Sequence, residues 1–497
     1  MRKYYLTIVV ALLVCLWGCA RQETAYLDVF YTADAEGFYH SRPEPRFENR
    51  VAGGYGILKS FLNRQQGSFL LFDGGNWFGS TPASALTQGA YVASFLKNIP
   101  YSAVSLSDKD FTYGWPALRG TVRELGYPVL VSNLKLDNQI PWPLHDYQIF
   151  TQNGIKIGVF GLVSPTLIEN HKTRLTGFTI QDPIQTAKEM VSLLQSKGVD
   201  FIILLSSLED NTADTPAEAV LAEEVPGINL LLSADKDREG AETDQINQTY
   251  IVYPGARLDS ISHLRILFDR NNQVKDISFE DVPLLQDLWG EDETLAVNAT
   301  RLEQETQKKL NARISQTDQE IKTSLIEESA LGDLLADCLH KWAKLDGVVL
   351  NSDSIRSSLP SGVITEYDLY KMYPYGDNIT FLTMRGAAFI KAMEFSLDAK
   401  DNFPQIAGFT VEYNPQGSHG ERIKKITLKN GRIIRPQETY RFAVTDHVLA
   451  GGLGHDYFID SLEFKNTFVD ARQIMRACLV RQKKVELPKM NRWKTVK

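Results

Sequence analysis

Short apolar runs separated by amphipathic segments dominate the amino-terminal half of this chain. Runs with the length of a buried strand occur at residues 26–31, 69–72, 102–106, 128–132, 155–162, 201–205 and 228–232. Segments with a helical spacing of apolar positions lie between them, at residues 53–66, 89–98, 115–125 and 184–197. This alternation is typical of a sheet covered by helices on both faces, so it predicts a layered α/β domain that ends near residue 300.

A hydrophilic segment separates this domain from a second one. Residues 302–325 are rich in Glu, Gln, Lys and Asn and have few apolar positions, which is typical of an exposed helix that joins two domains. A chain of 497 residues is long enough for two cores. We therefore expect an export segment over residues 1–19, a first domain over 26–300, a linker helix over 301–328 and a smaller α/β domain over 329–497.

Polar side chains follow the apolar runs at the points where the strands are expected to end. Any one of them is ordinarily a solvated turn residue or a helix cap. Their joint position after separate strands changes this interpretation, because the carboxyl ends of parallel strands meet at one edge of a sheet. The residues expected to converge there are Asp34, Glu36, Asn76, Asp108, Lys109, Ser207, Asp235 and Asp237.

The amino terminus has the features of an export signal. Arg2 and Lys3 precede an apolar run over residues 6–17, which is too short to span a membrane. Gly18 directly before Cys19, with Leu16 upstream, looks like a bacterial lipobox, in which Cys19 is lipidated. The interpretation is a protein of the bacterial cell envelope with a lipid anchor in the membrane; plain secretion with cleavage nearby is the alternative.

Composition argues against nucleic acid as a partner and leaves the oxidation state of two cysteines open. The formal net charge is −8 and no basic block occurs, which argues against a nucleic-acid-binding protein. Cys338 and Cys478 each lie in a helical pattern of the second half. Two buried free thiols are more expected than a catalytic pair, and a disulfide between them in an oxidising envelope is left open by the sequence.

Several segments together resemble the motifs of one enzyme family. The segments at residues 32–37, 73–82, 107–114, 205–209 and 233–237 resemble T-N-D-x-H-G, D-A-G-D-x-x-Q-G-T-P, G-N-H-E-F-D-Y-G, L-S-H-L-G and G-G-H-S-H. These are motifs of the 5'-nucleotidase family. The resemblance implies a layered, calcineurin-like metallophosphoesterase domain joined by a helix to a smaller α/β nucleotidase domain that binds the nucleoside. It also implies hydrolysis of a phosphoester by two metal ions.

The chain departs from the family at the positions that the resemblance assigns to chemistry. Asp34 is the one metal ligand that is retained. The other ligands correspond to Glu36, Asn76, Asp108, Ser207, Asp235 and Asp237. Lys109 stands at the position of the catalytic histidine, and none of the four histidines in the first half (His40, His145, His171 and His263) occupies a motif position. Lys109 would offer positive charge to a phosphate, or take the place of a lost metal by pairing with Asp34 or Asp108.

The remaining donors are mostly oxygen atoms. Oxygen ligands suit Mg²⁺, Mn²⁺ or Ca²⁺ better than Zn²⁺. Two states are therefore expected as alternatives: one hard divalent cation, or no cation, with the carboxylates neutralised by Lys109 and Lys236.

The second half contains the positions that the resemblance assigns to substrate binding. The loop that starts at Asn351 and ends at Arg356 resembles N-G-G-G-I-R, whose arginine holds the nucleotide's phosphate. Phe403 corresponds to an aromatic residue that stacks on the base, and His455 to the residue that stacks on the opposite side. In ordinary proteins such an arginine makes a surface ion pair, and such a phenylalanine packs in the core.

Three functional hypotheses follow. In the first, the protein is anchored in the envelope and binds a nucleotide or related phosphorylated ligand between its two domains, with metal-dependent hydrolysis lost or altered. In the second, it is an active metal-dependent 5'-nucleotidase or phosphoesterase with an oxygen-ligated metal. In the third, it is an envelope interaction protein that uses only its surface. Asn76, Lys109 and Ser207 discriminate among them, because an enzyme needs a substitute for each.

Overall fold

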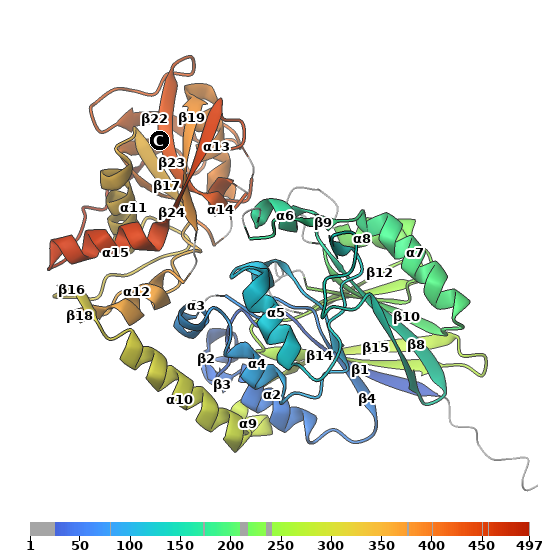
Figure 1. The fold of residues 1–497 in the computed structure, drawn as a ribbon. Helices are drawn as coiled ribbons and strands as arrows, with labels where there is room; N and C mark the ends of the chain where they lie inside the picture. The colour runs from blue at the N-terminus through green and yellow to red at the C-terminus, as the bar shows by residue number, and fades with distance from the viewer. Residues whose placement is uncertain are drawn as a thin grey trace, which may run out of the picture.

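The computed structural model of the chain has two lobes joined by one long helix (Figure 1). It describes residues 25–496 except 80, 172–173, 209–216, 235–240, 375–376, 400, 450 and 456. Cys19, Asp235, Lys236 and Asp237, on which sequence expectations fall, lie outside the described residues. Within the described part, no helix is long and apolar enough to cross a membrane.

The first sheet of the amino-terminal lobe has the strand order β15-β14-β1-β4-β5. Its strands are β1 (Tyr26–Thr32), β4 (Phe69–Asp73), β5 (Ala103–Val104), β14 (Ser260–Phe268) and β15 (Val274–Pro283). Strands β1, β4 and β5 are parallel, and Thr32 lies opposite Asp73, which lies opposite Val104. The loops that follow these three strands therefore emerge side by side at one edge.

The second sheet has the order β12-β13-β11-β10-β8-β7. Its strands are β7 (Tyr147–Gln152), β8 (Ile155–Val163), β10 (Phe201–Ser207), β11 (Leu230–Ser233), β12 (Glu242–Ile246) and β13 (Thr249–Tyr253). An apolar core from both sheets, with Val29 and Phe72 facing Ile157 and Leu205, fills the space between them. Continuous apolar runs are what strands buried on both faces require.

Helices cover the outer faces of both sheets (Figure 1). Against the first sheet lie α2 (Gly54–Leu62), α3 (Pro82–Thr87), α4 (Val92–Leu96) and α5 (Trp115–Glu124). Against the second lie α7 (Pro183–Ser196) and α8 (Ala217–Glu224). Shorter elements complete the lobe: β2 (Arg42–Glu44), β3 (Arg50–Ala52), β6 (Leu134–Leu136), α6 (Thr166–Asn170), β9 (Phe178–Ile180) and α9 (Gln286–Trp289). The predicted layered α/β architecture is confirmed.

The connecting helix differs from the sequence expectation. Helix α10 spans Glu293–Lys309, with Asp292 as its N-cap, so the predicted helix over residues 302–325 is wrong beyond Lys309. Strand β16 (Arg313–Thr317) follows and pairs with β18 (Gly362–Thr365). Ile314 of β16 is buried in the core of the second lobe, and this tertiary packing overrides the weak helical pattern.

One carboxylate on α10 connects the two lobes. The hydroxyl of Tyr39, in the amino-terminal lobe, donates to Glu303 Oε2 at 2.8 Å. The hydroxyl of Tyr367, on α12 (Glu366–Met372) of the second lobe, donates to Glu303 Oε1. Because both bonds end on an ionised acceptor, they are stronger than bonds between neutral groups.

The carboxyl-terminal lobe is a sheet with an apolar core on each face. The strand order is β20-β17-β23-β19-β24. Its strands are β17 (Gly347–Leu350), β19 (Asn378–Arg385), β20 (Gln405–Ala407), β23 (Thr439–Thr445) and β24 (Glu463–Asp470). Helices α11 (Ala330–Ala343) and α15 (Ala471–Gln482) pack on one face, and α13 (Gly386–Phe395) on the other. The lobe also contains β21 (Phe409–Tyr413), β22 (Ile423–Leu428), α14 (Asp446–Leu449) and β25 (Trp493–Thr495).

A disulfide joins the two helices on one face of this sheet. Cys338 of α11 is bonded to Cys478 of α15, 140 positions later in the sequence. The question that the sequence left open, whether these two cysteines pair, is therefore answered by the structure. Packing of Leu335 and Leu339 of α11 with Met475 and Leu479 of α15 in one core brings the thiols together, and a helical pattern alone does not specify that contact.

Removing this disulfide should destabilise the carboxyl-terminal lobe. Replacing both Cys338 and Cys478 by Ala should lower the free energy of unfolding by about 2–5 kcal/mol, because the cross-link closes a long loop and restricts the unfolded chain. Urea unfolding with and without reductant measures this. The double variant should not respond to reductant; a wild-type protein that is equally unresponsive would contradict the cross-link.

Candidate functional site

The loop after β1 holds two carboxylates in an unusual backbone conformation. Asp34 and Glu36 have φ angles of 56° and 47°, in the left-handed region that residues with a side chain seldom adopt. The loop after β4 supports this conformation: Gly75 O accepts from Asp34 N at 2.9 Å, and Asn76 O accepts from Glu36 N at 2.8 Å. Strained residues held by their surroundings are typical of functional sites.

Asp110 fixes the loop that contains Asn76. Its Oδ2 accepts from Asn76 N at 2.8 Å and from Ser107 N at 2.9 Å, and its Oδ1 accepts from Trp77 N at 2.7 Å. Gly75 is required in this loop, because a Cβ atom there would lie 2.6 Å from Ser107 N. Asp110 thus joins the loops after β4 and β5.

Asp73 supports the same loop from the end of β4. It accepts from Gly75 N at 2.8 Å and from Trp77 Nε1 at 2.7 Å. Burial raises the pKa of Asp73 to about 6 and that of Asp110 to about 7, and the donated hydrogen bonds oppose both increases. These two carboxyl groups point into the protein and shape the loops.

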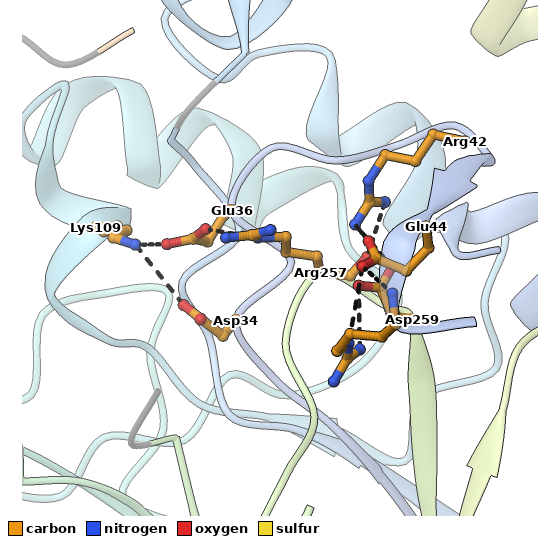
Figure 2. A network of polar contacts seen from close by, with 8 residues as sticks. Asp34, Glu36, Arg42, Glu44, Lys109, Arg257 and Asp259 are labelled. Carbon is orange, nitrogen blue, oxygen red and sulfur yellow. Dashed lines mark hydrogen bonds and ion pairs between the residues drawn. The ribbon is translucent and has the colours of Figure 1, made fainter. Parts of the chain in front are cut away.

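Lys109 points its ammonium group at the two carboxylates of the first loop (Figure 2). Its Nζ forms an ion pair with Glu36 Oε1 and lies 3.9 Å from Asp34 Oδ1. Its backbone N donates to Asn76 Oδ1 at 2.9 Å. Asp34 and Glu36 are buried, and a buried carboxylate that remains charged needs a cation nearby.

A second cation reaches the Glu36 carboxylate from a distant part of the chain. Arg257 Nε lies 3.5 Å from Glu36 Oε2, and Arg257 N donates to Asp34 O at 2.8 Å (Figure 2). Next to it, Asp259 Oδ1 accepts from Arg42 Nη2 at 2.7 Å. The sequence contained no signal for Arg257, because it belongs to no motif and only the fold brings the loop before β14 to this edge.

Asp108 and Ser207 have other polar partners. Asp108 Oδ1 lies 3.1 Å from His171 Nε2 and accepts from Asn170 Nδ2 at 3.0 Å. Ser207 Oγ donates to Leu106 O at 3.0 Å. His171, which the motifs did not identify, thus reaches the site from the end of α6. This contact depends on tertiary structure.

The described members of the donor set, from which Asp235 and Asp237 are missing, do not form a two-metal centre. Among the described residues, no group of three or more His, Cys, Asp or Glu side chains is arranged to hold a metal ion. An ammonium group adjoins Asp34 and Glu36, and Asn76 Oδ1 accepts a backbone hydrogen bond. Asp34 Oδ1 has no hydrogen-bond partner.

Asn351 and Arg356 lie on the loop after β17 in the second lobe. Asn351 is fully buried and donates from Nδ2 to Ser354 Oγ at 2.7 Å and to Asp353, so it shapes the loop. Arg356 is exposed, and its backbone N donates to Met372 O at 2.8 Å. The predicted phosphate-binding arginine is therefore on a fixed loop with its side chain at the surface.

Phe403 lines a cavity of about 480 Å³ in the second lobe. Tyr413, Leu397 and Arg422 line the same cavity. The ring of Phe403 packs edge-on against Trp493 at 5.0 Å between ring centroids. A cavity of this size with aromatic walls accommodates a small ring-containing ligand. Tyr413 was not predicted from the sequence.

His455 is engaged in local packing. Its Nε2 lies 2.9 Å from Ser396 Oγ, and its Nδ1 accepts from Tyr457 N at 3.2 Å. Its ring stacks on Tyr457 and Phe458. His455 is not one of the residues that line the cavity beside Phe403, whereas Tyr413 is.

Solved structures with the same architecture define the class of fold. A 5'-nucleotidase precursor from Thermus thermophilus matches with a TM-score of 0.73 at 18% identity, over 95% of this chain and 99% of that one. A putative 5'-nucleotidase from Staphylococcus aureus, solved with alpha-ketoglutarate, matches with a TM-score of 0.75 at 17% identity, over 95% and 100%. The chain therefore has the two-domain fold of these proteins.

Sequence comparison agrees with this fold. Residues 306–460 match the family model described as "5'-nucleotidase, C-terminal domain". A 5'-nucleotidase of Vibrio cholerae is 24% identical over 528 residues, covering 93% of each chain. Over nearly its whole length the chain is similar to proteins of the 5'-nucleotidase family, as its motifs indicated.

Replacing the carboxylate that joins the loops should destabilise the first lobe. Asp110→Asn should lower the free energy of unfolding by about 1–3 kcal/mol, because an amide cannot accept hydrogen bonds at both of its ends. Urea unfolding measures the change. The matched control, Asp276→Asn, alters an exposed carboxylate and should have no measurable effect. Equal stability of the two variants would contradict the assigned role.

Proposed function

We propose that this protein binds a nucleotide or a related phosphorylated ligand between its two lobes, and that two-metal hydrolysis of the ligand is lost. Relatives named 5'-nucleotidase and the shared fold support a nucleotide-related function. The observation that carries the proposal is the position of Lys109, whose ammonium group adjoins Glu36 and Asp34.

Electrostatics favours this interpretation of Lys109. Two buried carboxylates next to each other repel, and a metal ion is one way to neutralise them. Here Lys109 supplies positive charge to both carboxylates, and Arg257 supplies it to Glu36. A divalent ion at this position would have to approach two cations, and repulsion between like charges opposes that.

The second lobe supplies the proposed ligand-binding groups. Arg356 is exposed on the loop after β17, and a guanidinium matches the geometry of a phosphate group. The cavity beside Phe403 and Tyr413 offers aromatic walls to a base. Asn351 holds the loop of Arg356 in shape, and His455 supports the neighbouring turn through Ser396 and Tyr457.

The disulfide supports the proposed location in the cell envelope. Stable disulfides form in oxidising compartments, and Cys338 and Cys478 are paired. We propose that Cys19 carries the lipid that anchors the protein to the membrane, with the described lobes outside the cytoplasm.

An active phosphoesterase with one oxygen-ligated cation is the second candidate. Asp34 Oδ1 is buried without a hydrogen-bond partner, and such an oxygen is where a hard cation would bind. Asp34, Glu36 and Asp108 are the carboxylates among the candidate metal ligands that the structure describes. Mg²⁺, Mn²⁺ or Ca²⁺ would suit these donors.

Replacing Arg356 tests whether this residue binds the phosphate group of the ligand. Arg356→Ala should weaken the binding of AMP by about tenfold or more and leave adenosine binding within about twofold, because the guanidinium contacts only the phosphate. Phe403→Ala should weaken both ligands. Titration calorimetry measures the dissociation constants.

A matched variant controls for the loss of positive charge. Arg481→Ala removes an exposed arginine from the end of α15 and should leave both affinities unchanged. An equal loss of AMP and adenosine binding in Arg356→Ala would contradict the assigned role of Arg356. Absence of AMP binding by the wild-type protein would contradict the proposed function itself.

A further inference from the structure

Strand β24 is an edge strand of the carboxyl-terminal sheet, the last in its strand order. It pairs antiparallel with β19, and Phe464 lies opposite Leu382 in that ladder. In the described part of the chain, no strand pairs with its other side. An uncovered edge presents backbone donors and acceptors that another strand can use.

The exposed end of this strand is unusually apolar for a surface. Phe464 is 64% exposed and Leu462, just before the strand, is 55% exposed. Side chains two positions apart in an extended chain point to the same face, so Leu462 and Phe464 form one apolar stripe. Their face is that of Leu382, which belongs to the core beside α13, so the stripe continues that core past the edge of the sheet.

The charged residues on either side of Phe464 in one copy of the chain are complementary to the same residues in a second, antiparallel copy. Glu463 and Lys465 flank it, and both are exposed. In an antiparallel pair of two β24 strands with the two-fold axis at Phe464, each Glu463 faces Lys465 of the other copy and the two Phe464 rings meet. Opposite charges and aromatic rings that face each other across strands stabilise a sheet.

Neighbouring arrangements lack this match. An axis at Glu463 or at Lys465 places like charges opposite each other, and a parallel pair does the same at both positions. If the register of the antiparallel pair shifts by one residue, Phe464 lies opposite Glu463 or Lys465 of the other copy. The sequence around Phe464 therefore favours one arrangement, and its partner is a second copy of this chain.

We propose that two copies associate through β24, in an antiparallel pair centred on Phe464, to form a dimer with one continuous sheet. The two-fold axis makes the contact between Glu463 and Lys465 occur twice, while the two Phe464 rings meet once, on the axis. This inference is independent of the proposed ligand and of the state of Lys109.

Charge reversal tests the proposal without altering the core. Glu463→Lys and Lys465→Glu each place like charges opposite each other twice, and each should raise the dimer dissociation constant at least about tenfold. The double exchange Glu463→Lys with Lys465→Glu restores both opposite-charge pairs and should restore dimerisation. Phe464→Ser should also weaken the dimer.

Sedimentation equilibrium of the purified protein over roughly 1–100 µM measures the dissociation constant. Ile433→Ser, which replaces an exposed apolar residue elsewhere in the same lobe, is the matched control and should leave the dimer intact. A wild-type protein that stays monomeric throughout would overturn the proposal. A dimer that persists in both single charge variants would place the interface elsewhere and overturn it equally.

Discussion

The ion pairs around Asp34 and Glu36 are the interaction on which the proposed account of this protein depends. Both carboxylates are buried, and both residues have a left-handed backbone conformation that the neighbouring loop must stabilise. Buried negative charge requires compensation, and in this structure it comes from Lys109 and Arg257. The cations belong to the chain itself, so the charge at this edge is compensated without a ligand.

Two further carboxylates hold the loops around Asp34 and Glu36 in place. Asp73 and Asp110 accept backbone hydrogen bonds that fix the loops after β4 and β5, and neither group is needed as a metal donor for that role. The second lobe has a loop on which Arg356 is exposed and a cavity lined in part by Phe403 and Tyr413. One fold can support different functions, and binding without hydrolysis is the function that we propose here.

The sequence predicted what local patterns encode. The apolar runs indicated the buried strands. Because parallel strands end at one edge of a sheet, the motif at residues 107–114 was expected to place Lys109 near the loop that follows the first strand. Arg257, His171 and Tyr413 were missed because only tertiary structure brings them to their sites. The linker helix ended earlier than expected, and the two cysteines proved to be paired, because packing between distant segments decides both.

The metal content of the purified protein tests the central claim most directly. Elemental analysis after exposure to Mn²⁺, Mg²⁺ and Ca²⁺ should find fewer than about one ion per chain, with no phosphate released from AMP. A chain with Lys109→His, Asn76→Asp, Ser207→His and Asp235→His is the positive control and should bind more metal. Two ions per wild-type chain, with turnover that Asp34→Ala abolishes, would contradict the account.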